Sequence, residues 1–368
     1  MIRNKLLFIF TLSTLISQVA SAAPSCRSVV EDSSRQTSTG QLTEQQIVDS
    51  INKSKSYQDK RNKQWLEQRK CLCCHTTLPY MLSRGLDSKS RANFNKLKEM
   101  AEEKVENPAA EPWYHADHAG RNSKPTEAVL NALTLLMYDI SNRSELSTNT
   151  LKSMNRIFET MDADGHLHWL DYNLQPFESK KSELWGNSMA LLTIEMAKKH
   201  SNYQPPSEYT KLKAYMLKNV SKLKPHEMSV MLWANSMASS NRLLKPGLAK
   251  FFADKIRNSQ NENGSWNQKT VLGQGENKQN IYTTAISFIG LIKAGQGNTQ
   301  AAHKAAKWLS DQQQTGDFLE MGDGTTLWNA TSMNRVGSLL NDTFASDAAT
   351  SYSALALQIY KSEVLSIP

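Results

Sequence analysis

The sequence predicts an all-α protein made of about six helical hairpins. Apolar residues recur at helical spacing along most of the chain, and no run alternates convincingly at the period of two that a strand requires. A glycine-centred motif also follows several of the predicted helices at a regular interval, which is typical of a repeat protein.

The first 22 residues are predicted to be a secretory signal peptide. A short basic start precedes an apolar stretch at 6–16, and small residues follow at 20–22. We therefore expect a periplasmic or secreted protein, with a flexible leader at 23–42 and a single domain at 43–368.

Two kinds of predicted helix alternate along the chain. Strongly apolar helices, several of which begin at Pro, Ser or an acidic residue, are predicted at 125–143, 182–200, 225–239, 280–295 and 345–361. Helices with one apolar and one charged face suit an outer layer. These are predicted at 147–161, 206–223, 245–260 and 299–313, and two earlier helical segments, at about 44–69 and 88–107, bring the total close to six hairpins.

The charge distribution excludes some functions. The formal net charge is +8, and removal of the signal peptide with its two basic residues lowers it to about +6. The charges are spread over Lys-rich helical faces, so a solvated surface explains them. No basic and aromatic cluster indicates nucleic-acid binding. No stretch after the signal peptide approaches the roughly 20 apolar residues of a transmembrane segment.

The repeat motif has the form Gln-x3-Gly-x-aromatic after a helix. Its copies are Gln260, Gly264 and Trp266; Gln312, Gly316 and Phe318; and, more weakly, Met161, Gly165 and Leu167. The glycines are 99 and 52 residues apart, which gives a period near 50 with one unit between the first two. Glycine suits this position because it adopts the left-handed conformation that ends a helix.

The chain resembles proteins with squalene-cyclase repeats. The motif resembles that of squalene-hopene cyclases and of prenyltransferase repeats. The strings CHTTLPYMLSR, WLDYNLQPFESKKSELWGNSMALL and ASDAATSYSALAL are similar to those of exported bacterial proteins with such repeats. The resemblance covers residues 65–360. It implies an α/α toroid of inner and outer helices, and it implies no established reaction.

A cysteine-rich segment, KCLCCHTTLPY at 70–80, carries the strongest chemical signal. Cys71, Cys74 and His75 satisfy C-x-x-C-H, the spacing that attaches haem c to two thiols beside a histidine that binds the iron. Such attachment is made outside the bacterial cytoplasm, which agrees with the predicted signal peptide. We therefore expect haem c at this segment.

Two other uses of the segment stay open. Zinc has four candidate ligands in Cys71, Cys73, Cys74 and His75, although four ligands on so short a loop are sterically awkward. A disulfide is the other use, and Cys26 with Cys73 is the pair left over when haem occupies the remaining thiols.

The sixth iron ligand also stays open among four candidates. These are Met81, Met100, His115 and His118. A filled sixth position indicates electron transfer with a periplasmic redox partner, and an open one indicates ligand binding or peroxide chemistry.

An enzyme without haem is the alternative function. Terpene cyclases carry a D-x-D-D acid motif, but Asp162-Ala163-Asp164-Gly165 lacks the third acid and is predicted to be a turn. A polysaccharide-lyase-like enzyme would use acids or phenols. The candidates are Asp171, Tyr172, Glu178, Glu183, Asp342 and Asp347, with Glu183 and Asp347 expected at helix starts.

The apolar helices also supply large aromatic side chains. Trp185, Trp233, Phe288 and Tyr352 either fill the core or line a central cavity for an apolar, isoprenoid-like ligand. The leading prediction is an exported c-type haem protein with a redox or ligand-binding role, and a disulfide-stabilised binding module is the third interpretation.

Overall fold

A computed structural model describes residues 42–69, 71–85, 91–107, 123–238, 242–318, 324–333 and 339–366. The chain divides into two units, Met1–Gln41 and Leu42–Pro368, and every described residue belongs to the second. The predicted signal peptide, Cys26, His115 and His118 lie outside the described residues. The described part is all-α, as predicted, apart from two short strands.

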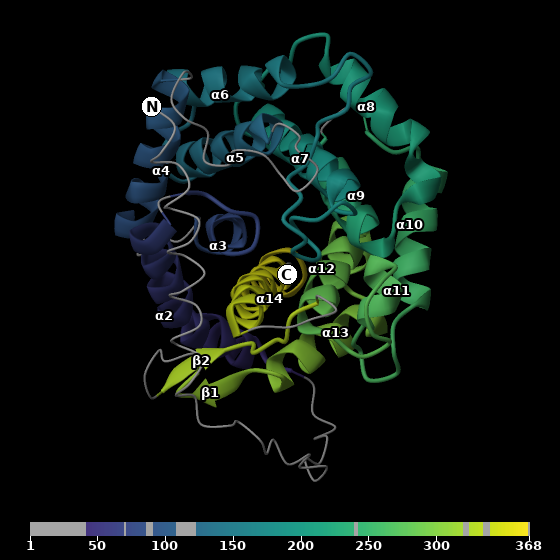
Figure 1. Ribbon diagram of the computed structural model, residues 1–368. Coiled ribbons are helices and arrows are strands. Elements are labelled where there is room, and N and C mark those ends of the chain that lie inside the picture. The colour runs from purple at the N-terminus through teal and green to yellow at the C-terminus, as the bar shows by residue number, and fades with distance from the viewer. Residues whose placement is uncertain are drawn as a thin grey trace, which may run out of the picture. The chain divides into compact units, whose positions relative to one another are not determined.

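One set of helices is buried on nearly all sides, as helices inside a large protein are. It consists of α3 (Thr77–Arg84), α5 (Lys124–Asn142), α7 (Glu183–Ser201), α9 (Pro225–Met237), α12 (Ile281–Leu291) and α14 (Leu339–Tyr360). Each helix contacts the next in this order, and α14 contacts α3. The contacts therefore return to the first helix of the set (Figure 1).

The second set alternates with the first along the chain and is more exposed. It consists of α2 (Glu44–Arg69), α4 (Arg91–Glu106), α6 (Thr148–Glu159), α8 (Tyr209–Lys218), α10 (Pro246–Asn258) and α13 (Gln300–Asp311). These helices pack against the first set: α6 on α5, α8 on α7, α10 on α9, α13 on α12, and α2 on α14. In Figure 1, α4, α6, α8 and α10 lie outside α5, α7 and α9.

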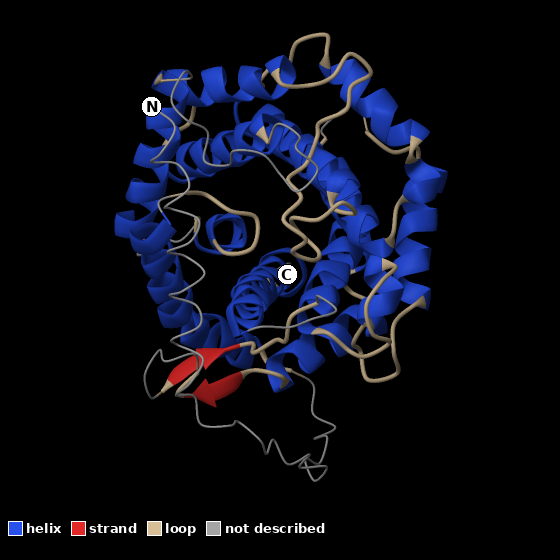
Figure 2. Ribbon diagram, viewed as in Figure 1, coloured by secondary structure: helices blue, strands red, loops and turns tan. Residues whose placement is uncertain are grey.

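Short elements complete the described structure. They are α11 (Gln268–Leu272), the 3-10 turn η2 (Val220–Lys222), the π-helical turns η3 (Ile292–Gln296) and η4 (Lys361–Leu365), and the strands β1 (Gln314–Gly316) and β2 (Thr325–Leu327). The strands pair antiparallel with Thr315 opposite Thr326, and Figure 2 shows them in red. No helix in the described ranges has the length and apolar character needed to cross a membrane.

The repeat motif forms the predicted turn in two of its copies. Gly165 and Gly264 have φ angles of 92° and 95°, in the left-handed region that favours glycine. Each glycine also lies against the next outer helix. A Cβ atom would fall 2.3 Å from the carbonyl oxygen of Lys211 at the first position, and 2.4 Å from that of Lys304 at the second. Both the conformation and the close approach therefore require glycine.

The third copy of the motif is different from the prediction. Gly316 ends strand β1 instead of forming a left-handed turn. The aromatic side chain that occupies the motif's place is Trp328, not Phe318. Trp328 donates its indole N–H to a carbonyl oxygen of α13 at 2.6 Å, just as Trp266 donates to one of α10 at 2.8 Å. The β1–β2 hairpin is thus inserted between α13 and this tryptophan.

Two helices also depart from the predicted boundaries. Helix α3, which follows the cysteine segment, has no counterpart among the predicted helices. Helix α14 begins at Leu339, so Asp347 lies inside it, and the expectation that Asp347 begins a helix is wrong. Glu183 is the first residue of α7, as expected.

The turn glycines provide a test of the repeat geometry. We expect Gly264→Ala to lower the free energy of unfolding by about 2 kcal/mol or more, because the left-handed backbone and the contact with Lys304 both disfavour a Cβ atom. Gly247→Ala in α10 is the control, since no atom lies within 4 Å of its added Cβ. That variant should stay within about 1 kcal/mol of the wild type in urea unfolding. Equal losses in the two variants would contradict the argument.

Candidate functional site

The cysteine segment connects α2 to α3 and lies inside the protein. Cys73 and Cys74 are buried, and Cys71 is half-buried. The three described cysteines form no disulfide with one another. Burial raises the pKa of each thiol, that of Cys71 to about 12, so the thiols are uncharged at neutral pH. Uncharged buried thiols are poor nucleophiles and poor metal ligands. Cys26 lies outside the described residues, so its pairing with Cys73 stays a prediction.

Glu178, from the loop before α7, contacts this segment although 104 residues separate it from Cys74. Its Oε1 accepts the backbone N–H of Cys74 at 3.0 Å, and the side chain is buried. Burial raises the pKa of Glu178 to about 7, and the hydrogen bonds from Cys74 oppose this rise. Glu178 therefore carries a proton over much of the mildly acidic range.

His75 is enclosed by aromatic rings. Phe344 stacks on it with ring centroids 3.9 Å apart, and Trp65 meets it edge-on at 4.9 Å. Its Nδ1 lies 2.9 Å from the hydroxyl oxygen of Thr76. Burial, together with the positive charges of Arg61 and Arg69, lowers the pKa of His75 to about 3, so the ring is neutral.

Asp347 holds the same region from α14. Its carboxylate accepts both Arg61 Nε, at 2.8 Å, and Arg61 Nη2, at 2.9 Å. It also accepts the hydroxyl groups of Tyr57, at 2.8 Å, and Thr76, at 2.7 Å. Thr76 in turn contacts His75, so this buried network orients the histidine.

The described segment does not fit a haem group. A cavity of about 20 Å³ lies beside His75, lined in part by Phe344 and Phe177. That is room for about one water molecule, whereas pockets for drug-sized ligands hold about 300–1,000 Å³. Cys74 and His75 are both buried against protein groups. A porphyrin would require α3 and Phe344 to move apart.

Two of the four predicted iron ligands lie in the described ranges, and both pack against other protein groups. Met81 is buried in α3, and the hydroxyl group of Thr134 donates to its sulfur at 2.8 Å. Met100 packs on the core from α4. His115 and His118 lie outside the described residues. Asp171 accepts the backbone N–H of Asn173 at 3.1 Å within a loop, and Asp342, in the first turn of α14, accepts that of Ser332 at 2.6 Å.

Aromatic side chains fill the space between the inner helices. Phe177, next to Glu178, contacts Trp185, Tyr282 and Tyr352 with centroid distances of 5.3, 4.8 and 6.3 Å. The hydroxyl oxygen of Tyr282 also lies 2.5 Å from Nε2 of the buried His226. Among the described residues, Trp185 and Tyr352 therefore act as core residues. Trp233 and Phe288 are buried as well.

A second group, predicted only as a turn, has the geometry of a metal site. One oxygen of Asp162, Oδ2, lies 3.2 Å from His168 Nε2 and 3.8 Å from His166 Nδ1. Ligand atoms around a tetrahedral zinc ion are about 3.3 Å apart when the bonds are about 2.0–2.1 Å long. Within the described ranges, the ligand atoms of these three side chains converge, and the cysteines with His75 form no such group.

Glu183 and Tyr215 support His166 from the other side. Glu183 Oε1 lies 2.9 Å from His166 Nε2, and this contact raises the pKa of His166. Tyr215 of α8 stacks on the ring with a centroid distance of 4.9 Å. His166 is only 14% exposed, whereas His168 and Asp162 are 37% and 51% exposed, so solvent reaches the group.

The matching turn of a later repeat shows what is particular to this group. Both turns have the same backbone, because the residue three before the glycine donates its N–H to the carbonyl of the residue after it, at 2.8 and 2.9 Å. In the later turn, the Asn261 amide donates to the side-chain oxygens of Ser265 and Asn267, both at 2.9 Å. These residues occupy the positions of Asp162, His166 and His168, counted from the glycine. At the later turn these side chains hydrogen-bond to one another, whereas at the earlier turn the same positions carry a carboxylate and two imidazoles, which are groups that can bind a metal ion.

The sequence contains a signal for this group that the turn interpretation overlooked. Asp162, His166 and His168 lie within seven positions of one another. The sequence interpretation assigned Asp162 and Gly165 to a turn and proposed no function for the two histidines that follow them. The turn itself is confirmed by the conformation of Gly165.

Comparisons with known proteins add no relative. No family model matches the chain, and a search of the curated proteins finds no match either. The functional argument therefore depends on the geometry of the described residues.

The buried acid next to Cys74 predicts a dependence of stability on pH. The raised pKa of Glu178 favours the folded state at low pH, and this contribution is lost as pH rises from 4.5 to about 7. Glu178→Gln mimics the protonated form, so its stability relative to the wild type should rise across this range by roughly 3 kcal/mol. Urea unfolding at several pH values measures the difference. Glu227, whose pKa burial also raises to about 7, remains in both proteins and cancels. A difference that does not change with pH would argue against the buried acid.

The packing of the cysteine segment predicts the result of a haem test. We expect that the full-length chain, exported from a host that matures c-type cytochromes, retains no haem after denaturation, because Cys74 and His75 are enclosed. An alkaline pyridine spectrum detects covalently retained haem. A control cytochrome must mature in the same cells, and retained haem in the test protein would restore the prediction from the C-x-x-C-H motif.

Proposed function

We propose that the protein is an α/α toroid of the squalene-cyclase repeat type that binds a divalent transition-metal ion through Asp162, His166 and His168. One observation carries the metal proposal: nitrogen atoms of two imidazoles approach the same carboxylate oxygen within 3.2 and 3.8 Å. Lone pairs on these three atoms can face one another only when a cation or protons lie between them, and a single metal ion satisfies all three at once.

The toroid is supported by the helix contacts and by the repeat turns. The inner set of helices closes on itself through α14 and α3, and the outer set packs on its outside. The turns at Gly165 and Gly264 share one backbone geometry and one contact with the next outer helix. Repeated units of this kind bury their apolar faces only against their neighbours.

The ligand set favours zinc, with iron as the closest competitor. Imidazole and carboxylate together suit Zn²⁺ and Fe²⁺ better than Mg²⁺ or Ca²⁺, which prefer oxygen ligands. Three protein ligands leave a position open, as catalytic zinc sites do, and a zinc ion lowers the pKa of water bound there to about 7.

Glu183 has the position of a supporting acid. A metal-bound histidine commonly passes its second ring N–H to a carboxylate, which fixes the ring and strengthens it as a ligand. Here His166 turns Nδ1 toward Asp162 and Nε2 toward Glu183. The first residue of α7 thus holds the ligand in place.

The haem, its partners and the export of the chain stay predictions from sequence. This applies to haem c at Cys71 and Cys74, to a periplasmic redox partner and to an apolar ligand, and the enclosed packing of His75 does not favour the haem. Export to the periplasm or medium depends on residues 1–22, which the structure does not describe.

A variant that copies the side chains of the later repeat tests the metal site. The wild type should bind about one Zn²⁺ per chain in equilibrium dialysis with elemental analysis. Replacing the three ligands together with Asp162→Asn, His166→Ser and His168→Asn should abolish this binding. The fold should persist, because the turn at Asn261, Ser265 and Asn267 has the same backbone with these side chains. Glu183→Gln should weaken binding by about 10- to 100-fold.

The pH dependence separates a metal site from a set of ion pairs. Without metal, the raised pKa of His166 gives stability that is lost as pH rises through that pKa. Zinc affinity should instead rise with pH over the same range, because the ligand must lose its proton. Unchanged zinc binding in the triple variant, or none in the wild type, would contradict the proposal.

A further inference from the structure

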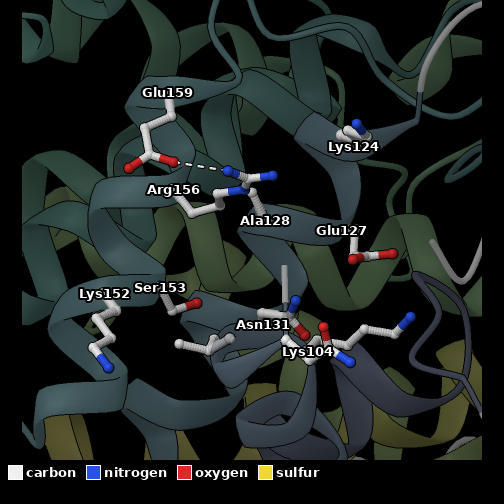
Figure 3. Close-up of a pocket in the computed structure, with 11 residues that line it drawn as sticks. Lys104, Lys124, Glu127, Ala128, Asn131, Lys152, Ser153, Arg156 and Glu159 are labelled. Atoms are coloured by element: carbon white, nitrogen blue, oxygen red, sulfur yellow. Dashed lines mark hydrogen bonds and ion pairs between the residues drawn. The ribbon is translucent and has the colours of Figure 1, made fainter. Parts of the chain in front are cut away.

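A pocket between α4, α5 and α6 lies apart from the residues discussed above. Its volume is about 190 Å³. Its lining combines positive side chains with two carboxylates, two amides and a hydroxyl (Figure 3). The polar lining residues are Lys104, Asn107, Lys124, Glu127, Asn131, Lys152, Ser153, Arg156 and Glu159.

The charge of the lining favours an anion. Four basic side chains face two acidic ones, and Arg156 is centrally placed between Glu159 and α5 in Figure 3. Arg156 Nη1 donates to Glu159 at 2.9 Å, which leaves the other N–H groups of the guanidinium able to bind a ligand. A guanidinium group suits an oxyanion because its N–H groups match two oxygens at once.

Two buried polar side chains of the pocket lack a hydrogen-bond partner among the described residues. Asn131 is 5% exposed and Ser153 is 1% exposed, yet no described group pairs with Asn131 Oδ1 or Ser153 Oγ. Such groups are rare because an unpaired buried polar atom is costly. Both line the pocket, so a ligand that fills it can pair with them. Asn131 Oδ1 is an acceptor and requires a donor, such as a hydroxyl group.

We propose that this pocket binds a small hydroxylated organic anion, whose phosphate or carboxylate group meets Arg156 and whose hydroxyl groups meet Asn131 and Ser153. The size agrees, since a cavity of about 150 Å³ accommodates a six-membered carbon ring. This inference does not depend on the metal site, because it shares no residue with it.

Calorimetry with the full chain at low ionic strength tests the proposal. The probes are inorganic phosphate, glycerol phosphate and galacturonate, and the last two distinguish a phosphate ester from a sugar acid. At least one hydroxylated probe should bind about tenfold or more tightly than inorganic phosphate. Arg156→Gln should weaken that binding by at least tenfold.

Matched variants keep the test independent of folding and of general charge. Arg257→Gln is the control, because Arg257 is 40% exposed against 39% for Arg156 and also pairs with an acid three residues away on its outer helix. It should bind as the wild type does. Asn131→Asp keeps the shape of the side chain and adds a negative charge, so it should also weaken binding at least tenfold.

Three results would overturn the proposal. These are equal binding in Arg156→Gln and Arg257→Gln, no advantage of the hydroxylated probes over inorganic phosphate, and no binding of any probe to the wild type. Binding only to vesicles of anionic lipid, unaffected by free glycerol phosphate, would likewise assign the charge to a membrane contact and refute a small-molecule pocket.

Discussion

The described part of the structure depends on a buried ion pair that joins its first helix to its last long helix. Arg61 in α2 and Asp347 in α14 are 286 residues apart, and two hydrogen bonds of 2.8 and 2.9 Å connect them. Removing one partner of a buried pair costs several kcal/mol, because the other charge stays in the interior. The hydroxyl groups of Tyr57 and Thr76 satisfy the remaining capacity of the carboxylate. Helix α2, the first helix of the described structure, thus packs against α14, the last long one.

The turns at the two motif glycines share one backbone conformation but carry different side chains. The backbone of the turns at Gly165 and Gly264 is the same, and both press against the carbonyl group of a lysine in the next outer helix. In the turn at Gly264, the side chain of Asn261 hydrogen-bonds to those of Ser265 and Asn267. In the other, the same positions carry two imidazoles and a carboxylate. Function on such a fold lies in side chains placed on loops that the scaffold holds still.

The sequence predicted those helices whose apolar residues recur at helical spacing. The predicted ranges of the longer helices agree with α2, α5 and α7 to within about two residues, because the apolar pattern follows each helix directly. Helix α3 has only eight residues, too few for a periodic signal, and its cysteines suggested a loop. The inserted β1–β2 hairpin placed Phe318 where the motif required Trp328. Contacts across many residues, such as Glu178 with Cys74, follow from the fold alone.

The same distinction explains why the two chemical motifs have different surroundings in the structure. C-x-x-C-H is complete within five residues, but Cys74 and His75 are buried and uncharged, and aromatic rings enclose His75. Cys71 is half-buried. Inside the core a cysteine behaves as a small apolar side chain, and the His75 imidazole pairs with the Thr76 hydroxyl group. The group at Asp162 has a less regular spacing, yet its atoms converge at a turn that solvent reaches, with an acid behind it. Spacing along the chain identifies groups that chemistry requires. Whether such groups can act depends on their exposure to solvent and on the convergence of their ligand atoms. Both conditions are met at the Gly165 turn, whose side chains differ from those of the matching turn at Gly264.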